Sequence, residues 1–134
     1  MKSFHLKIAT PDGMVFDGQA ESLLVRTAEG DAEILAGHVD FLSALNTGRA
    51  RITVGGENRL ASASGGFVSV KNGEVSVVAT TFEFADEIDV KRAKAAKEAA
   101  EAALSSAVDK NAEIYFKAKL ARAVSRISVW ELSK

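Results

Sequence analysis

The feature that most constrains this chain is an abrupt change of composition after Phe84. Between Ile88 and Trp130 the sequence holds no glycine and no proline, and alanine becomes its commonest residue. Such a stretch has high helix propensity, because glycine and proline are the residues that disfavour helices most. Residues 1–84 contain frequent turn residues instead. The chain therefore divides into residues 1–84 and residues 85–134, which are expected to differ in secondary structure.

The first part alternates apolar and polar side chains with the period of two that is typical of β-strands. Three sets of apolar side chains each predict one buried face: Phe4, Leu6 and Ile8; Ala50, Ile52 and Val54; Val75, Val77 and Ala79. Turn sequences separate these runs, and Asn72-Gly73 is the strongest hairpin signal because both residues tolerate positive φ. Many short strands without a crossover helix are typical of an antiparallel β-sandwich or a small barrel, and we favour the sandwich.

The second part predicts two helices. The segment Val108-Asp109-Lys110-Asn111 interrupts the alanine-rich run. Asp89 and Asp109 are suitable N-caps, because a short carboxylate accepts the free amide hydrogens of a first helical turn. The second helix is expected to end near Trp130. We therefore expect an antiparallel two-helix hairpin after the sandwich, and an α+β fold in two parts for the whole chain.

The facing surfaces of these two helices predict a weakly held hairpin. Apolar side chains recur at spacings of three or four: Ala93, Ala96, Ala100, Ala103 and Ala107 on the first helix, and Phe116, Leu120, Ala123, Ile127 and Trp130 on the second. Burial contributes about 0.8 kcal/mol per methylene, so an alanine face contributes far less than a leucine face. Because isolated helices of this length are marginal in water, we expect the hairpin to open easily. Whether Trp130 packs in the seam or contacts a partner is left open.

Charge and composition exclude several classes of protein. The formal net charge is -1, with seven Lys/Arg and ten Asp/Glu in residues 1–84 against ten and eight in residues 85–134. No dense basic surface is evident, so nucleic acid is not expected as a partner. No apolar run approaches the roughly 20 residues of a membrane-spanning helix, and no signal or transit peptide is recognisable. We expect a cytoplasmic, bacterial protein without direct membrane insertion.

No catalytic residue and no metal site are expected. The chain has no phosphate-binding loop of the nucleotide hydrolases and no cysteine. The segment Ser62-Ala63-Ser64-Gly65-Gly66 lacks the flanking glycines of a nucleophile elbow and is interpreted as a structural turn. The two histidines, His5 and His38, have no metal-ligand spacing. His5 is expected to be simply exposed on the polar face of a strand, and His38 is a candidate contact residue.

The expected second helix is basic, with five Lys/Arg and one acid in residues 110–130. Arg122 and Arg126 are four residues apart, so both guanidinium groups project from one helix face and can bind phosphate or carboxylate oxygens. The ordinary interpretation of such a pair is a solvated helix face. In an antiparallel hairpin, however, this part of the second helix lies beside Asp89 and Arg92. Three arginines and an aspartate are therefore expected to converge.

Five short motifs are weak alone and specific together: Thr10-Pro11-Asp12-Gly13, Glu29-Gly30-Asp31, Gly37-His38, Ser64-Gly65-Gly66-Phe67 and Ile88-Asp89-Val90-Lys91-Arg92-Ala93. With this combination the chain resembles, over essentially its full length, the epsilon subunit of the bacterial F-type ATP synthase. The last motif matches the Ile/Leu-Asp-x-x-Arg-Ala pattern that belongs to an ATP-sensing site in bacterial members of that family.

The resemblance implies a non-catalytic central-stalk subunit of a proton- or sodium-driven rotary ATP synthase, peripheral on the cytoplasmic face of the bacterial plasma membrane. Residues 1–84 would be a docking domain for the gamma subunit and the membrane ring of c subunits. Residues 85–134 would be a regulatory hairpin that, when extended, meets the catalytic beta/alpha subunits and inhibits ATP hydrolysis. The implied rotor-interface residues are Gly30, Asp31, Gly37 and His38.

The resemblance also implies that ATP is a regulatory ligand of the folded hairpin and that no cofactor is obligatory. The phosphates would lie near Arg92, Arg122 and Arg126. Adenine would lie near Glu83, Ile88 and Asp89. The implied nucleotide-binding residues are Glu83, Ile88, Asp89, Arg92, Ala93, Arg122 and Arg126.

Three positions depart from the family pattern. Ala99 and Tyr115 stand where some nucleotide-binding relatives carry further arginines, which predicts weaker ATP binding. Ala36 stands where many relatives have proline before the Gly-His pair, which predicts a less rigid loop. Two alternatives stay open: a purely structural stalk subunit that binds no nucleotide, and an unrelated hydrolase or carbohydrate-binding sandwich with a helical tail.

Overall fold

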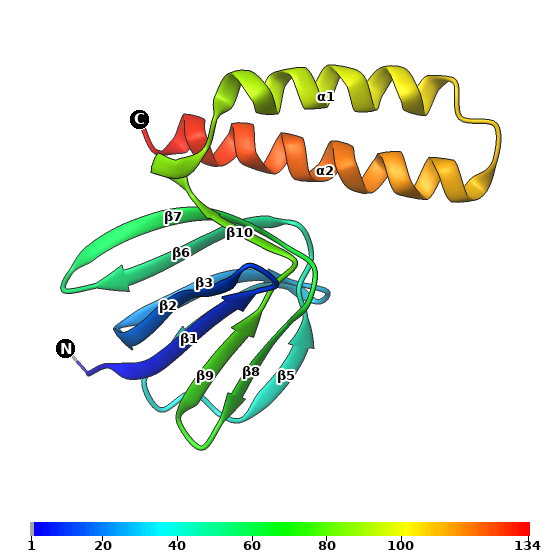
Figure 1. The fold of residues 1–134 in the computed structure, drawn as a ribbon. Coiled ribbons are helices and arrows are strands. Elements are labelled where there is room, and N and C mark those ends of the chain that lie inside the picture. Colours follow the sequence, from blue (N-terminus) through cyan, green and yellow to red (C-terminus); the bar gives the residue numbers. More distant parts are fainter. Residues whose placement is uncertain (1) are drawn as a thin grey trace.

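The computed structural model describes residues 2–134 as two β-sheets followed by a helical hairpin (Figure 1). The strands come first and the two long helices last, as the change of composition predicts. In chain order the elements are β1 (Phe4–Thr10), β2 (Gly13–Ala20), β3 (Ser22–Thr27), β4 (Gly30–Leu35), β5 (Phe41–Ala44), β6 (Gly48–Val54), β7 (Glu57–Ser64), β8 (Phe67–Lys71), β9 (Glu74–Val78), β10 (Thr81–Phe84), the 3-10 turn η1 (Ala85–Glu87), α1 (Val90–Ser105) and α2 (Lys110–Leu132).

The strands form two five-stranded sheets that pack face to face. One sheet has the order β2-β1-β9-β8-β5, and the other has the order β10-β7-β6-β3-β4. The predicted sandwich is confirmed, but one pair of strands differs from the antiparallel prediction. Strands β1 and β9 run parallel, with Leu6 opposite Val75. The sequence did not indicate this pair, because hairpin turns fix the direction only of strands that are neighbours in the chain.

The core lies between the two sheets and is built from the alternating apolar positions. Leu6, Ile8 and Ile52 are almost completely buried, as predicted. Full burial of such a side chain contributes about 1.5–3 kcal/mol. Val54, which belongs to one of the predicted buried sets, is exposed where β6 ends. The connected core contains sandwich residues from Phe4 to Phe84.

Two turns depend on particular backbone conformations. Asn72 and Gly73 have φ values of 52° and 80°, so both residues of the predicted β8–β9 turn adopt positive φ. Gly66 approaches β9 so closely that an added Cβ would lie 1.7 Å from the carbonyl oxygen of Val78. Only glycine fits at this position, which supports the interpretation of the Ser62–Gly66 segment as structural.

The two helices begin at the predicted caps. The Asp89 carboxylate accepts a hydrogen bond from the Arg92 amide at 3.1 Å, and the Asp109 carboxylate accepts one from the Ala112 amide at 2.7 Å. The second helix continues to Leu132, two residues beyond the predicted end.

The predicted alanine face of α1 is only partly buried. Ala93 and Ala100 are buried against α2, whereas Ala96 is exposed. Trp130 is half-buried, with the Lys94 ammonium of α1 5.9 Å and the Lys134 ammonium 3.8 Å from its ring. The tryptophan therefore lies at the hairpin seam, beside α1.

The hairpin is folded onto the sandwich, with α2 against β7 and β6 (Figure 1). The C-terminal half of α2 makes this joint, and the turn between the helices projects beyond the sheet. Ala123 and Val129 are fully buried. The hydroxyl groups of Ser62 and Ser125 form a buried hydrogen bond of 2.7 Å between sheet and helix. The joint is therefore narrow and uses small or polar side chains.

Within residues 2–134, neither helix has a stretch long and apolar enough to cross a membrane.

His5 is not simply exposed, so the prediction for this residue was wrong. Its side chain is 31% exposed and lies between carboxylates of the two strands that flank β1. Nε2 is 2.6 Å from Asp17 Oδ1 on β2, and Nδ1 is 2.9 Å from Glu74 Oε2 on β9. These hydrogen bonds, the one to Asp17 foremost, raise the pKa of His5 above 6.5, and the same contact lowers the pKa of Asp17.

This cluster predicts a pH-dependent contribution to stability. A raised folded-state pKa means that His5 stabilises the fold fully below 6.5 and that this contribution disappears as pH rises through the folded-state pKa. The thermal unfolding temperatures of the parent and of His5→Gln should therefore differ most in mildly acidic buffer and become similar at alkaline pH. His38→Gln, which contacts neither carboxylate, is the control. A difference between parent and His5→Gln that is constant across this range contradicts the prediction.

Candidate functional site

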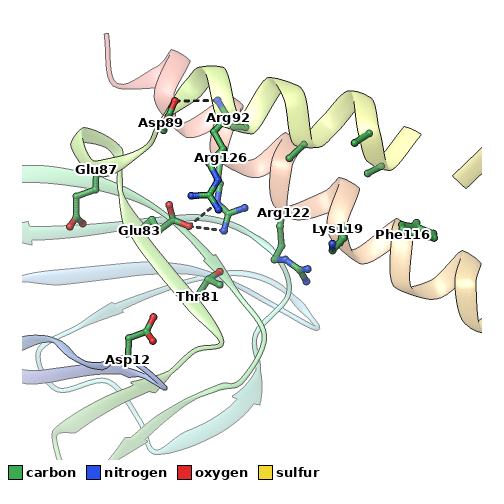
Figure 2. A pocket seen from close by; sticks show the side chains of 14 residues that line it. Asp12, Thr81, Glu83, Glu87, Asp89, Arg92, Phe116, Lys119, Arg122 and Arg126 are labelled. Carbon is green, nitrogen blue, oxygen red and sulfur yellow. Dashed lines mark hydrogen bonds and ion pairs between the residues drawn. The ribbon is translucent and has the colours of Figure 1, made fainter. Parts of the chain in front are cut away.

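A pocket with a volume of about 610 Å³ lies where the hairpin meets the sandwich (Figure 2). Its walls come from both helices, from β10 and η1, and from the turn between β1 and β2. The pocket therefore exists only while the hairpin is folded down. The lining residues are Asp12, Thr81, Glu83, Glu87, Asp89, Arg92, Ala93, Ala96, Ala99, Ala100, Phe116, Lys119, Arg122 and Arg126.

The acidic and the basic side chains of the lining come from different elements. The four acids come from the sandwich side and from the cap of α1, whereas the four bases all come from the helices. Lys119, Arg122 and Arg126 share one face of α2, because their spacings are three and four residues. Opposite charges therefore face each other across the joint.

One pair of these charges is in direct contact. Glu83 Oε1 accepts a hydrogen bond from Nε of Arg126 at 2.7 Å and forms an ion-pair contact of 2.6 Å with Nη2 (Figure 2). The side chains of Arg126 and Glu83 are 26% and 35% exposed. Because Glu83 belongs to β10 and Arg126 to α2, this ion pair fastens the hairpin to the sandwich.

The other two arginines of the pocket are available to a ligand. Among residues 2–134, neither the Arg92 nor the Arg122 guanidinium makes a hydrogen bond or an ion pair of the kind that Arg126 makes. Figure 2 shows Arg122 extending from α2 toward the sandwich. Asp89 caps α1 at the rim of the same pocket. Two unpaired guanidinium groups in one hollow favour an anionic ligand.

Six of the seven residues predicted to bind nucleotide line this pocket: Glu83, Asp89, Arg92, Ala93, Arg122 and Arg126. Ile88 does not line it and is 8% exposed, because it ends η1 with its side chain packed inside. The convergence of Arg92, Arg122 and Arg126 on one pocket is confirmed. Their nucleotide-binding role stays a prediction.

The sequence did not predict five of the charged, polar or aromatic residues that line the pocket. The spacing of Lys119 from Arg122 was a usable signal, since it places both on one helix face. The others had no local signal, because the fold brings them together from distant parts of the chain. The missed residues are Asp12, Thr81, Glu87, Phe116 and Lys119.

The predicted rotor-interface residues lie in two separate places at opposite ends of β4. Gly30 and Asp31 begin β4, directly after the β3–β4 turn, and the Asp31 carboxylate pairs with Arg26 at 3.1 Å. Gly37 and His38 lie in the β4–β5 loop, where His38 Nδ1 donates to the Val39 carbonyl at 2.7 Å. The structure therefore does not join the four residues in one site.

The β4–β5 loop and the strand residues beside it, Leu35 of β4 and Leu42 of β5, carry exposed apolar side chains. Val39 and Leu42 are 74% and 71% exposed, and Leu35 is 51% exposed. Exposed apolar side chains that gather near one loop are typical of a contact surface. His38 belongs to this loop, and Gly30 and Asp31 do not.

The fold and the pocket define a two-part protein, a β-sandwich with a helical hairpin folded against it across a charged joint. Both parts match models of known protein domains. Residues 3–85 match the β-sandwich domain of the ATP synthase delta/epsilon chain, and residues 86–131 match the long α-helix domain of the same chain. The chain belongs to the ATP synthase delta/epsilon chain family.

Similar proteins named ATP synthase epsilon chain occur in several bacteria. The chain is 37% identical to the one from Halalkalibacterium halodurans, with 96% of this chain and 98% of the relative covered. It is 39% identical to the one from Bacillus velezensis, with the same coverage of 96% and 98%. The resemblance inferred from the motifs is confirmed, and with it the prediction of an accessory subunit rather than an enzyme.

Solved structures of mitochondrial ATP synthases contain similar chains. A chain in the cryo-EM structure of the Euglena gracilis enzyme, OSCP/F1/c-ring in rotational state 1, has a TM-score of 0.78 and 25% identity, covering 98% of this chain and 81% of that one. A chain in the central stalk and c-ring structure from Tetrahymena thermophila has a TM-score of 0.64 at 18% identity, with coverages of 98% and 96%. The second likeness supports the fold alone.

The ion pair across the joint predicts how the hairpin is released. Glu83→Gln removes the charge that holds Arg126. We expect this change to destabilise the docked hairpin, relative to the open one, by about 1 kcal/mol. Amide hydrogen exchange in α2 should accelerate, while exchange in the sandwich core stays unchanged.

Glu113→Gln is the matched control, because the Glu113–Lys117 pair of 2.9 Å lies within α2 and does not reach the sandwich. Equal acceleration in both variants would show that Glu83 has no special part in holding the hairpin.

Proposed function

We propose that this chain is an epsilon-type central-stalk subunit of a bacterial rotary ATP synthase, and that its hairpin is a movable element that restrains ATP hydrolysis when extended. Family membership supports the stalk assignment. The narrow joint supports the movable hairpin, because few buried side chains are lost when α2 leaves the sheet. As a peripheral subunit, the chain would work on the cytoplasmic face of the plasma membrane.

We propose further that ATP binds in the pocket between the hairpin and the sandwich. The observation that carries this proposal is the convergence of Arg92, Arg122 and Arg126 from two helices on one hollow of about 610 Å³. Phosphate oxygens match the fork of donors that a guanidinium group presents. A triphosphate would bridge α1 and α2 and would neutralise cations that otherwise repel one another.

ATP in this pocket would favour the folded hairpin. A ligand that binds one of two states stabilises it by about 2.7 kcal/mol at a concentration of 100 times its dissociation constant. A joint built from one ion pair, one buried hydroxyl pair and a few small side chains is open to a shift of that size. Loss of ATP would then release α2 and expose its basic face to an acidic segment of a catalytic subunit.

The sandwich would supply the contacts with the rotor. We propose that the β4–β5 loop, with His38, Val39 and Leu42, contacts the gamma subunit or the membrane ring. Gly30 and Asp31 lie at the far end of β4 and would contact a different surface. The exposed apolar side chains of the loop support this division.

A purely structural stalk subunit is the second candidate, and two observations favour it. The Glu83 carboxylate already neutralises Arg126, one of the three arginines of the pocket. Ala99 lines the pocket where some relatives offer an arginine, so one cation of the family pattern is missing. In this candidate, Asp89 serves only as the cap of α1.

Calorimetric titration with ATP separates the two candidates. We expect the parent to bind ATP and Arg92→Ala and Arg122→Ala each to weaken binding by about tenfold, since each removes a charge-assisted contact. Arg59→Ala is the control, because Arg59 pairs with Asp86 outside the pocket. If the parent takes up no ATP at millimolar concentration, the nucleotide-sensing proposal fails and the structural candidate stands.

Removal of the hairpin tests the inhibitory role. A complex assembled with residues 1–88 should keep its subunits, because the sandwich core contains no helix residue. Its rate of ATP hydrolysis should rise above that of a complex with the full chain. Assembly is checked by co-purification of the gamma subunit. Unchanged hydrolysis in an intact complex argues against an inhibitory hairpin.

A further inference from the structure

A second pocket lies on the other flank of α2 and shares no residue with the first. It has a volume of about 360 Å³ and lies between the last turns of α2 and the strands β3 and β6. Arg26 and Arg49 come from the sheet, and Ser125 and Ser128 come from the helix. Like the first pocket, it therefore depends on the docked hairpin.

Arg49 lacks a counter-ion in this position. The sandwich has four arginines. Three of them form ion pairs: Arg26 with Asp31, Arg51 with Glu33, and Arg59 with Asp86. Arg49 forms no such ion pair and no side-chain hydrogen bond within residues 2–134, and it is only partly exposed. A partly desolvated guanidinium without a partner favours the entry of an anion.

The surroundings of Arg49 suit an oxyanion. Arg49 lies opposite Ser62 in the β6–β7 register, beside the buried Ser62–Ser125 hydrogen bond. The pocket lining includes the hydroxyl groups of Thr47 and Ser128 and contains no aspartate or glutamate. Asp31 pairs with Arg26 from outside the lining, but Arg49 and the hydroxyl groups have no carboxylate partner within residues 2–134. Such donors bind phosphate or carboxylate oxygens.

Gly48 keeps the second arginine in place. A Cβ added to Gly48 would lie 2.8 Å from Cδ of Arg26, so the stem of Arg26 packs directly against the backbone of Gly48. This close approach holds Arg26 at the wall of the pocket, where it also pairs with Asp31. Any larger residue at position 48 would push Arg26 aside.

We propose that this second pocket is an oxyanion site, in which a phosphate or carboxylate group binds to Arg49 with the help of Arg26 and the hydroxyls of α2. Since its walls belong to both parts of the chain, an occupied site fastens α2 to β6 and favours the docked hairpin. The site shares no residue with the first pocket, so an anion can bind there without ATP. It gives the joint a second point at which an anion controls hairpin release.

The test is a titration of the full chain, followed by nuclear magnetic resonance, with inorganic phosphate in one arm and propionate in the other. Sodium chloride keeps the ionic strength constant. We expect the Arg49 Nε signal and the Ser125 and Ser128 amide signals to shift and saturate. Arg49→Gln should weaken binding by about tenfold or more, whereas Arg59→Gln should bind like the parent.

Gly48→Ala is a second variant, which should also weaken binding because it displaces Arg26.

Saturable shifts with either anion support the site, and the anion that binds more tightly assigns its chemistry to phosphate or to carboxylate. Absence of saturable shifts with both anions overturns the proposal, and so do equal affinities of the parent and Arg49→Gln. ATP binding is followed separately at Arg92 and Arg122, so failure of the nucleotide proposal leaves the outcome at Arg49 unchanged.

Discussion

The contact on which the behaviour of this protein depends is the joint between α2 and the second sheet. It combines the Glu83–Arg126 ion pair, the buried hydrogen bond between Ser62 and Ser125, and the small buried side chain of Ala123. Polar contacts of this kind contribute little net free energy, because water offers equivalent partners to the separated groups. The joint therefore specifies where the hairpin docks more strongly than it stabilises the docked state.

The sandwich is independent of this joint. Its connected core ends at Phe84, and the buried side chains of the helices, such as Ala93 and Val129, lie outside that core. Opening of the hairpin thus exposes a few small side chains and leaves the packing between the sheets intact. The helical part can therefore open while the sandwich stays folded, since local opening needs only the free energy of the contacts that it breaks.

Local sequence patterns predicted most of the fold, because strands, turns and caps depend on neighbouring residues. The alternation around Leu6, the turn at Asn72 and the cap at Asp89 are examples. Contacts between distant residues were not predictable in the same way. The parallel pairing of β1 with β9 and the place of His5 between Asp17 and Glu74 are determined by the order of strands in the sheet. The same holds for the candidate site. Helix spacing predicted its arginines, whereas Asp12 and Thr81 reach the pocket only through the fold and were not predicted.

The two flanks of α2 differ in how their charges are satisfied, and this difference bears on regulation. On one flank Arg126 already has a carboxylate partner, so a ligand there must either compete with Glu83 or use Arg92 and Arg122. On the other flank Arg49 has no partner within the described part of the chain, so an anion there would not compete with a carboxylate for Arg49. Each flank would gain a stabilising charge from an anion bound at its proposed site, and each pocket exists only in the docked state. By linkage, anions bound at the proposed sites would shift the hairpin toward docking, and their absence would favour the form with the exposed basic helix.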